Sequence, residues 1–347
     1  MATTVRAATG LACALALSGC GGHLFRPLPA RSEPVARIAF GSCLRQGKPQ
    51  PVWDALVAAE PDLTLLLGDN VYADTHDPAV LAAAYEALFA EPGFQRLRAV
   101  SPVLAIWDDH DYGWNDAGAE YPMRRESERL FLAHFDAGRR SARRRRAGIY
   151  EAHRFGRPGR RLQVLLLDGR SFRSRRGDEP TDDPAATMLG AAQWRWLEAE
   201  LRRPAELRLV VSGVQVVADT VRRECWGDFP RERRRLFELV ATTGAGGVVL
   251  LSGDRHFGEL SRFDGGPYPL YDLTSSGMNV AIGSNSREDV RNDHRVGEPY
   301  LGDNYGTVTI DWTAPDPTVD LRIHDVTGAP RLSHRLRLSE LQPAAGR

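Results

Sequence analysis

Four apolar runs in this sequence each end in side chains that can bind metals or transfer protons. The runs are RIAFGSC, DLTLLLGDNVY, PVLAIWDDHDYGWND and GGVVLLSGDRH, and they lead to these residues: Cys43; Asp69 and Tyr72; Asp108, Asp109, His110, Asp111 and Asn115; Asp254 and His256. Buried strands do not need such groups at their ends for stability. The carboxyl edge of a sheet is the usual position of an α/β active site. The pattern therefore predicts a metal-dependent hydrolase.

The segment Gly68-Asp69-Asn70-Val71-Tyr72 places a phenol three residues after a carboxylate. One tight loop can direct both groups to the same point. A carboxylate suits the bridging of two cations about 3.5–4 Å apart, and a phenolate is a hard anionic ligand suited to ferric iron. We expect Asp69 and Tyr72 to bind metal. The alternative is a turn aspartate beside a packed tyrosine.

The segment Trp107-Asp108-Asp109-His110-Asp111 gathers three carboxylates around one imidazole. These charges repel one another unless cations or a protonated histidine compensate them. We expect Asp109 or Asn115 to be a metal ligand. His110, kept protonated by its acidic neighbours, would donate a proton to a leaving oxygen. The alternative is an acidic surface turn.

The segment Gly253-Asp254-Arg255-His256 has an aspartate and a histidine at positions i and i+2. On extended backbone these two side chains project the same way, so both could reach one metal. The motif is weak alone and gains weight from the other two. Cys43 lies at the same kind of strand end, so we expect a metal ligand there rather than a disulfide with Cys225.

The amino terminus has the pattern of an export signal. The apolar stretch from about Leu11 to Leu17 is too short to span a bilayer and has the length of a signal h-region. Leu17-Ser18-Gly19-Cys20 resembles the bacterial lipoprotein cleavage motif, in which Cys20 is lipidated. We expect a signal peptide over 1–19, a tether over 20–34 and one catalytic domain over 35–347. The product would be exported and lipid-anchored, facing the periplasm or on the cell surface. The alternative is an ordinary cleaved signal with a chance cysteine.

The formal net charge of the 347 residues is zero, so no overall field favours a nucleic-acid partner. Apolar runs alternate with helical patterns, which predicts a largely α/β sheet covered by helices. We expect strands at 37–42, 63–68, 102–107, 162–168, 208–217 and 247–252, and helices at 51–59, 78–90, 126–135, 191–202 and 231–242. The last third reads as alternating strands, which predicts a second, more antiparallel sheet packed on the first.

The ordered motifs GSC, LGDNVYADT, WDDHDYGWND, SGVQ, SGDRHFGEL and YDLTSSGMN resemble those of the PhoD-like alkaline phosphatases, within the calcineurin-like metallophosphoesterase superfamily. The resemblance covers about residues 36 to 340. It implies an α/β fold, a four-layer α-β-β-α sandwich of two packed mixed sheets. It also implies Fe³⁺ and Ca²⁺ as cofactors and phosphate esters as substrates, cleaved by metal-activated hydroxide with His110 assisting the leaving group.

Carried over by residue, the resemblance implies an iron ligand at Cys43, a bridging carboxylate at Asp69 and an iron-binding phenol at Tyr72. Asp109, or alternatively Asn115, falls near the superfamily's metal-binding asparagine. His110 matches the catalytic histidine, and Asp254 and His256 occupy the last metal-binding motif. Gln215 stands where other members have a ligating histidine.

Arg170 and Arg173 follow the run VLLLDG, and guanidinium groups pair well with phosphate oxygens. They are candidate substrate-binding residues, with a surface role as the alternative.

Three other functions compete with phosphomonoester hydrolysis. A phosphodiesterase, including phospholipase D-type cleavage, would suit a membrane-tethered enzyme with a phospholipid substrate. Cys43 could instead be a nucleophile activated by His110 or His256, which leaves the carboxylates unexplained. A non-catalytic binding lipoprotein would not need the acid and histidine residues.

Overall fold

Two mixed six-stranded sheets form the centre of the molecule. The computed structural model describes residues 25–136, 141–177, 179–219, 224–284 and 291–343. One sheet has the order β12 (Pro330–Arg337), β11 (Thr318–Asp325), β10 (Asn304–Asp311), β1 (Arg37–Gly41), β2 (Leu63–Leu67) and β3 (Val103–Ile106). The other has the order β4 (Glu151–Phe155), β5 (Leu162–Leu166), β6 (Leu207–Val211), β7 (Val248–Ser252), β9 (Leu270–Ser275) and β8 (Gly258–Phe263).

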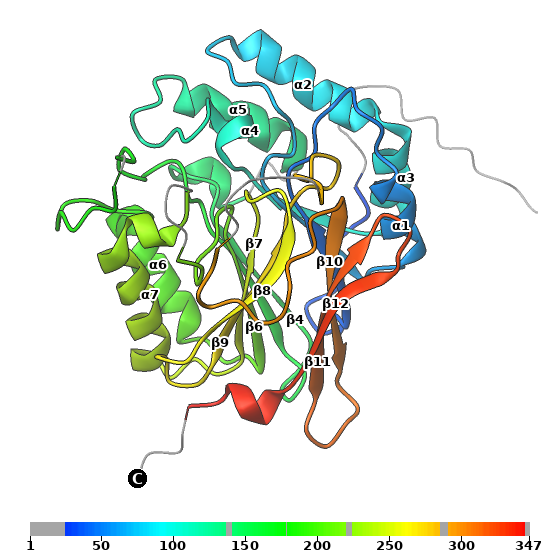
Figure 1. Cartoon of the computed structure of the whole chain (residues 1–347), viewed down its shortest axis with the longest axis vertical. Coiled ribbons are helices and arrows are strands. Elements are labelled where there is room, and N and C mark those ends of the chain that lie inside the picture. Colours follow the sequence, from blue (N-terminus) through cyan, green and yellow to red (C-terminus); the bar gives the residue numbers. More distant parts are fainter. Residues whose placement is uncertain (1–24, 137–140, 178, 220–223, 285–290, 344–347) are drawn as a thin grey trace, which may run out of the picture.

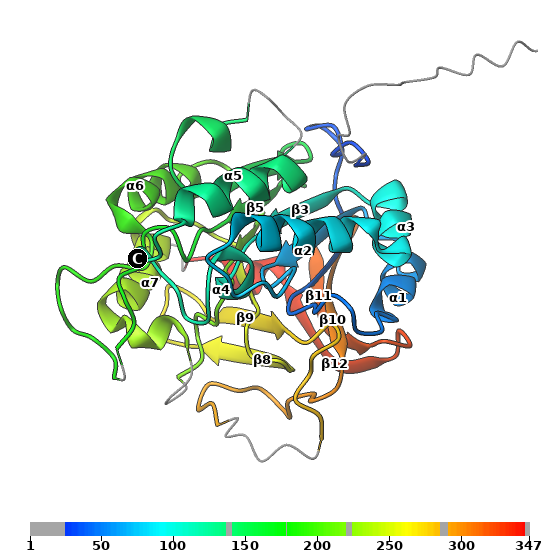
Figure 2. The same ribbon diagram turned by 90° about the horizontal axis from the view of Figure 1, so that it is seen from above.

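Helices cover the outer faces of the two sheets (Figure 1). On one side lie α1 (Val52–Ala58) and α3 (Pro92–Val100), and on the other lie α6 (Gly190–Leu201) and α7 (Pro230–Thr242). Viewed from above, α2 (Pro78–Ala90), the short α4 (Asp109–Tyr112) and α5 (Arg124–Phe135) lie across one end (Figure 2). The predicted α/β sandwich of two packed mixed sheets is confirmed.

The parallel strands carry the apolar core. All residues of β2, β3, β5, β6 and β7 are buried. Parallel strands covered on both faces read as continuous apolar runs, which is why the sequence predicts them well.

The last third of the chain does not form the separate sheet that its pattern predicts. Instead, β9 pairs in parallel with β7, and β10 pairs antiparallel with β1, so these strands extend both sheets. Alternation of polar and apolar residues identifies a strand with one face exposed, but it does not show with which other strand that strand pairs.

The strand predicted over 208–217 ends early, at Val211. The backbone N–H groups of Val216 and Val217 donate to the buried carboxylate of Asp272, at 2.8 and 3.0 Å, rather than to a neighbouring strand. The apolar residues beyond Val211 therefore belong to a buried loop. The elements α3, α4 and β4 were not predicted.

Candidate metal centre

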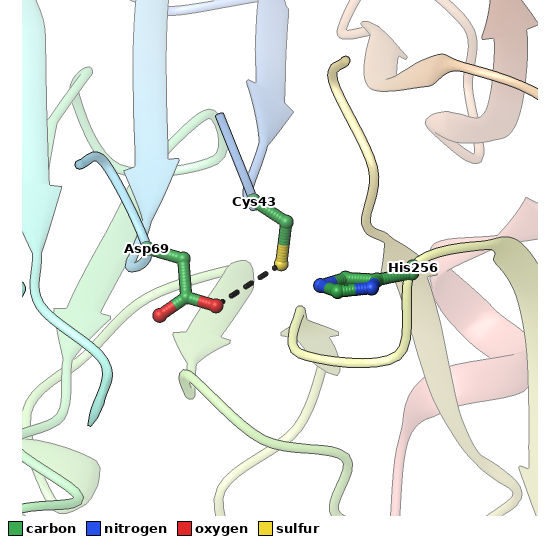
Figure 3. A group of neighbouring side chains, drawn as sticks. All are labelled: Cys43, Asp69 and His256. Carbon is green, nitrogen blue, oxygen red and sulfur yellow. Dashed lines mark hydrogen bonds between the residues drawn. The ribbon is translucent and has the colours of Figure 1, made fainter. Parts of the chain in front are cut away.

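Cys43, Asp69 and His256 converge at the carboxyl ends of three strands (Figure 3). They follow β1, β2 and β7, and their ligand atoms all lie within 4.8 Å of one another. The Cys43 Sγ lies 3.3 Å from Asp69 Oδ2, and Ser276 Oγ lies 3.1 Å from the same sulfur. Cys43 and Asp69 are buried. Cys225 is also buried, and neither cysteine forms a disulfide.

Four predicted ligands sit on left-handed backbone. The φ angles are 62° at Cys43, 50° at Asp69, 70° at Asp254 and 59° at His256. Residues other than glycine rarely adopt this region, and such strain concentrates at functional sites. The sharp turn after each strand aims these side chains into one space.

Tyr72 reaches the same group, as its spacing from Asp69 predicts. Its hydroxyl lies 3.0 Å from His256 Nε2 and 3.4 Å from Asp69 Oδ2. Burial, together with the negative charges of Cys43 and Asp69, raises the pKa of Tyr72 well above its usual value. The phenol would therefore ionise only beside a compensating cation.

A second group adjoins the first through Asp109. The ligand atoms of Asp108, Asp109 and Asp254 lie within 4.8 Å of one another, as do those of Asp69, Asp109 and His110. Burial and the nearby Asp108 and Asp109 charges raise the pKa of Asp254 to about 8. Burial also acts to raise the pKa of Asp109, but the Arg170 and His110 charges outweigh it and hold that pKa at about 2.

The sequence predicts either Asp109 or Asn115 as a metal ligand. Asp109 is buried in the cluster, where it accepts hydrogen bonds from the backbone N–H groups of His110, at 3.0 Å, and Asp116, at 2.7 Å. Asn115 lies beyond α4 and is exposed. The geometry favours Asp109.

His110 lies beside the cluster and is largely covered. Its ring packs against Tyr72 with centroids 4.3 Å apart, and its Nδ1 lies 2.6 Å from Asp74 Oδ1. Burial acts to lower the pKa of His110, but the Asp74 hydrogen bond and the Asp109 charge outweigh it and raise that pKa to about 9. Asp74 was not predicted as a site residue, although it lies two residues beyond Tyr72 in the same loop.

Arg170 and Arg173 are buried, so the surface alternative is wrong. Arg170 bonds Asp108 through Nε at 2.6 Å and Glu224 through both terminal nitrogens, at 2.7 and 3.0 Å. Arg173 also pairs with Glu224. Their guanidinium groups therefore pair with buried carboxylates, one of which, Asp108, belongs to the second metal-capable group. A role in holding substrate phosphate stays a prediction.

Two other buried residues stabilise the surroundings. The Gln215 amide donates to Thr274 at 2.9 Å and also bonds Glu259, so this position takes part in a buried polar network. Asp111 accepts hydrogen bonds from the backbone N–H groups of Asp69 and Asp108, at 3.3 and 2.7 Å. Asp111 thus joins the two acidic loops, a role that its place in the motif does not reveal.

The donor set fits metal binding. Burial raises the pKa of Asp69 well above its usual range, with the Cys43 and Asp109 charges adding to the effect. Such crowding of like charges is costly unless cations compensate it. A thiol, a phenol, an imidazole and a carboxylate suit a transition metal, whereas Asp108, Asp109 and Asp254 offer only the oxygen ligands that hard cations prefer.

Two packed mixed sheets thus carry a cluster of metal-capable side chains at one strand edge, and both the fold and the site point to one family. The chain belongs to the PhoD-like phosphatase family, whose model matches residues 38–300. It is similar to alkaline phosphatase D of Bacillus subtilis, with 21% identity over 297 residues, 69% of this chain and 49% of that protein. The chain thus spans about half the length of this relative.

Solved structures share the fold. The structure of PhoD superposes with a TM-score of 0.74 at 18% identity, covering 92% of this chain and 74% of that one. A dimetal phosphatase from Danio rerio gives a TM-score of 0.51 at 13% identity, covering 90% and 100% respectively. The anchor protein GAP50 of the Plasmodium inner membrane complex gives 0.57 at 10% identity, covering 88% and 89%.

Proposed function

We propose that this chain hydrolyses phosphate esters with the help of bound metal ions, as an alkaline phosphatase D-like enzyme. The observation that carries the proposal is the adjacency of two metal-capable groups, joined through Asp69 and Asp109, with His110 next to both. Two-metal phosphatases need this kind of paired site.

We assign ferric iron to Cys43, Asp69, Tyr72 and His256, and calcium to Asp69, Asp109 and Asp254. The mixed sulfur, phenol and imidazole donors support iron, and the carboxylates support calcium. When bound, the cations supply Lewis-acid chemistry, which polarises a phosphoryl oxygen and lowers the pKa of water. The carboxylates that would hold the cations are buried at Asp69 and Asp109 and half-buried at Asp254.

His110 assists the leaving group. Asp74 accepts the Nδ1–H hydrogen bond at 2.6 Å, which fixes the ring and leaves Nε2 to act on the substrate. The Asp74 hydrogen bond favours the imidazolium form, which can donate a proton to the departing alkoxide.

The direct test measures hydrolysis of p-nitrophenyl phosphate and bis-p-nitrophenyl phosphate by the full chain. We expect turnover that a chelator abolishes, that added metal restores, and that His110→Asn lowers by about 10²–10⁴-fold. Activity that resists chelation but is lost on thiol alkylation would instead favour Cys43 as a nucleophile. Turnover unchanged in His110→Asn would favour the non-catalytic alternative.

The same assay separates monoesterase from diesterase activity. A strong preference for the diester would favour phosphodiesterase or phospholipase D-type cleavage over the monoester reaction.

We also propose that Cys20 is lipidated and anchors the exported protein to a bacterial membrane. This residue and the predicted signal peptide lie outside the described residues, so the support is the sequence motif. Phe25, five residues after Cys20, packs against Phe89 with ring centroids 5.7 Å apart. Within the described part of the chain, no helix is long and apolar enough to cross a membrane. Metabolic labelling with a fatty acid, lost in Cys20→Ala, tests the anchor.

A further inference from the structure

We propose that Asp108 is an additional ligand of the oxygen-coordinated cation, with Arg170 holding its carboxylate in the binding orientation. The inference deepens the proposed function, since it rests on a cation occupying the group of Asp108, Asp109 and Asp254. It assigns a role to the first aspartate of the acidic motif, which neither the ligand set above nor the role of His110 uses.

One oxygen of Asp108 is fixed by Arg170. The Arg170 Nε donates to Asp108 Oδ1 at 2.6 Å, and the terminal nitrogens of the same guanidinium donate to Glu224. Because Glu224 bonds both of these nitrogens, the planar guanidinium cannot turn away from Asp108. Both partners of this ion pair are almost completely buried.

The backbone closes around the same side chain. A Cβ at Gly213 would lie 2.4 Å from Asp108 Oδ1, and a Cβ at Gly68 would lie 2.5 Å from Asp108 Cβ. A side chain at position 213 would displace the carboxylate, and one at position 68 would displace the Asp108 Cβ and its backbone. Two strand ends thus leave just enough space for Asp108 in its observed orientation.

The other oxygen of Asp108 lacks a partner. Oδ2 is buried and accepts no hydrogen bond from the part of the chain that the structure describes. Leaving a buried acceptor unsatisfied costs about 1–3 kcal/mol, and more for a charged group.

A cation is the partner that satisfies this oxygen. The carboxylates of Asp108, Asp109 and Asp254 offer ligand atoms within 4.8 Å of one another. Three carboxylate oxygens around one point suit calcium, which takes six to eight oxygen ligands. Arg170 reaches Asp108 through Oδ1, so Oδ2 remains for the cation. Asp108 therefore joins the ligand set, and Arg170 is a positioning residue.

The test is calcium binding by Asp108→Asn, measured by calorimetry on the full chain and checked with Tb³⁺ luminescence. Arg170 Nε requires an acceptor, so the amide oxygen of the substituted side chain should face Arg170 and its NH₂ should face the cation position. An NH₂ group cannot ligate calcium, and we expect an affinity at least about 10-fold weaker than that of the wild-type chain. Asp182→Asn, an exposed substitution with the same charge change, should bind like the wild type.

Two further variants keep the test decisive. Asp254→Asn should weaken calcium binding as a positive control. Arg170→Lys retains the positive charge but loses the planar guanidinium that bonds Asp108 and Glu224 at once. It should weaken calcium binding, because the Asp108 carboxylate is no longer held in place. If Asp108→Asn unfolds, the Arg170→Lys measurement decides, and wild-type affinity in that variant would overturn the proposal.

The outcomes separate this assignment from the proposed function. Wild-type affinity and stoichiometry in Asp108→Asn, alongside weakened binding in Asp254→Asn, would overturn the role of Asp108 alone. A wild-type chain that hydrolyses phosphate esters but binds no calcium would overturn both the calcium assignment and this inference. A wild-type chain without any metal-dependent hydrolysis would overturn the proposed function.

Discussion

His110 and Asp74 are joined by a hydrogen bond of 2.6 Å between Nδ1 and Oδ1. His110 lies in α4, after β3, whereas Asp74 lies in the loop after β2 and has left-handed backbone with φ of 45°. The loop that carries Asp69 and Tyr72 therefore also orients the imidazole. One turn of chain supplies two proposed metal ligands and the partner of the proposed acid.

Asp74→Asn should lower the pKa of His110 from about 9 toward its ordinary value near 6.5, because the neutral amide no longer favours the imidazolium. Imidazole NMR titration of the metal-free protein measures this shift. Turnover should fall by about 10–100-fold, because part of the rate gain from proton donation by His110 is lost.

Asp77→Asn is the matched control, since Asp77 is exposed and caps α2. It should leave the pKa of His110 unchanged. A His110 that titrates near 9 in both variants would show that Asp74 does not set its charge.

The metal-free protein should lose stability as pH rises, because several groups have a raised pKa in the folded state. The pKa of Asp254 is about 8 and that of Asp111 about 7, both raised chiefly by burial. For such a carboxyl, the stability contribution is complete below the unfolded pKa near 4 and is lost as pH approaches the folded pKa. For His110 the corresponding loss runs from about 6.5 to about 9.

Thermal melts between pH 4.5 and 9 in chelator should therefore show a falling Tm. Saturating calcium should reduce the decrease in Tm that is due to Asp254, because the cation stabilises the charged form of this carboxyl. A chelated protein whose Tm rises over this range would contradict the assigned burial of these carboxyls.

Cys43→Ser should remove iron from the chain, because the sulfur lies within the cluster at 3.3 Å from Asp69 Oδ2. We expect a loss of affinity larger than the roughly 10–100-fold typical of changes in residues that only support a ligand. Iron content and the visible absorption of the purified protein measure it.

Cys225→Ser provides a matched control, since both cysteines are buried. It should retain iron and its absorption band. Equal iron content in the wild type and Cys43→Ser would remove the cysteine from the ligand set.

Asp111→Ala should destabilise the fold by at least about 3 kcal/mol, because its carboxylate accepts three backbone N–H groups that would be left buried and unpaired. These donors belong to Asp69, Asn70 and Asp108, at 3.3, 3.2 and 2.7 Å. Urea denaturation of the metal-free chain measures the loss. Asp111→Asn, which keeps one acceptor oxygen, should cost less.

Much of the site could be predicted from local pattern. Cys43, Asp69, Asp254 and His256 follow buried strands, and the strands are recognisable because full burial requires continuous apolar runs. Parallel strands bring their carboxyl ends to one edge, so residues at those ends can be expected to meet. The motif spacing also placed Tyr72 correctly beside Asp69.

Long-range pairing determines those parts of the fold that the local sequence pattern does not predict. The alternation in the last third predicts strands, yet β8 and β9 join one sheet and β10 to β12 join the other. The run after Val211 is as apolar as a strand, but its backbone N–H groups bond Asp272, which lies 56 residues away from Val216. Pairing partners so distant along the chain leave no local signal.

The sequence by itself determined the family, the α/β fold class and the strand-end residues that converge, because these follow from burial and local spacing. The tertiary structure is what favours Asp109 over Asn115 as a ligand, and only it paired Arg170 with Asp108, 62 residues away, and with Glu224, 54 residues away. The physical reason is that charge pairing in a buried site depends on distance in space. A buried arginine that pairs with carboxylates and an arginine at the surface share the same local sequence pattern.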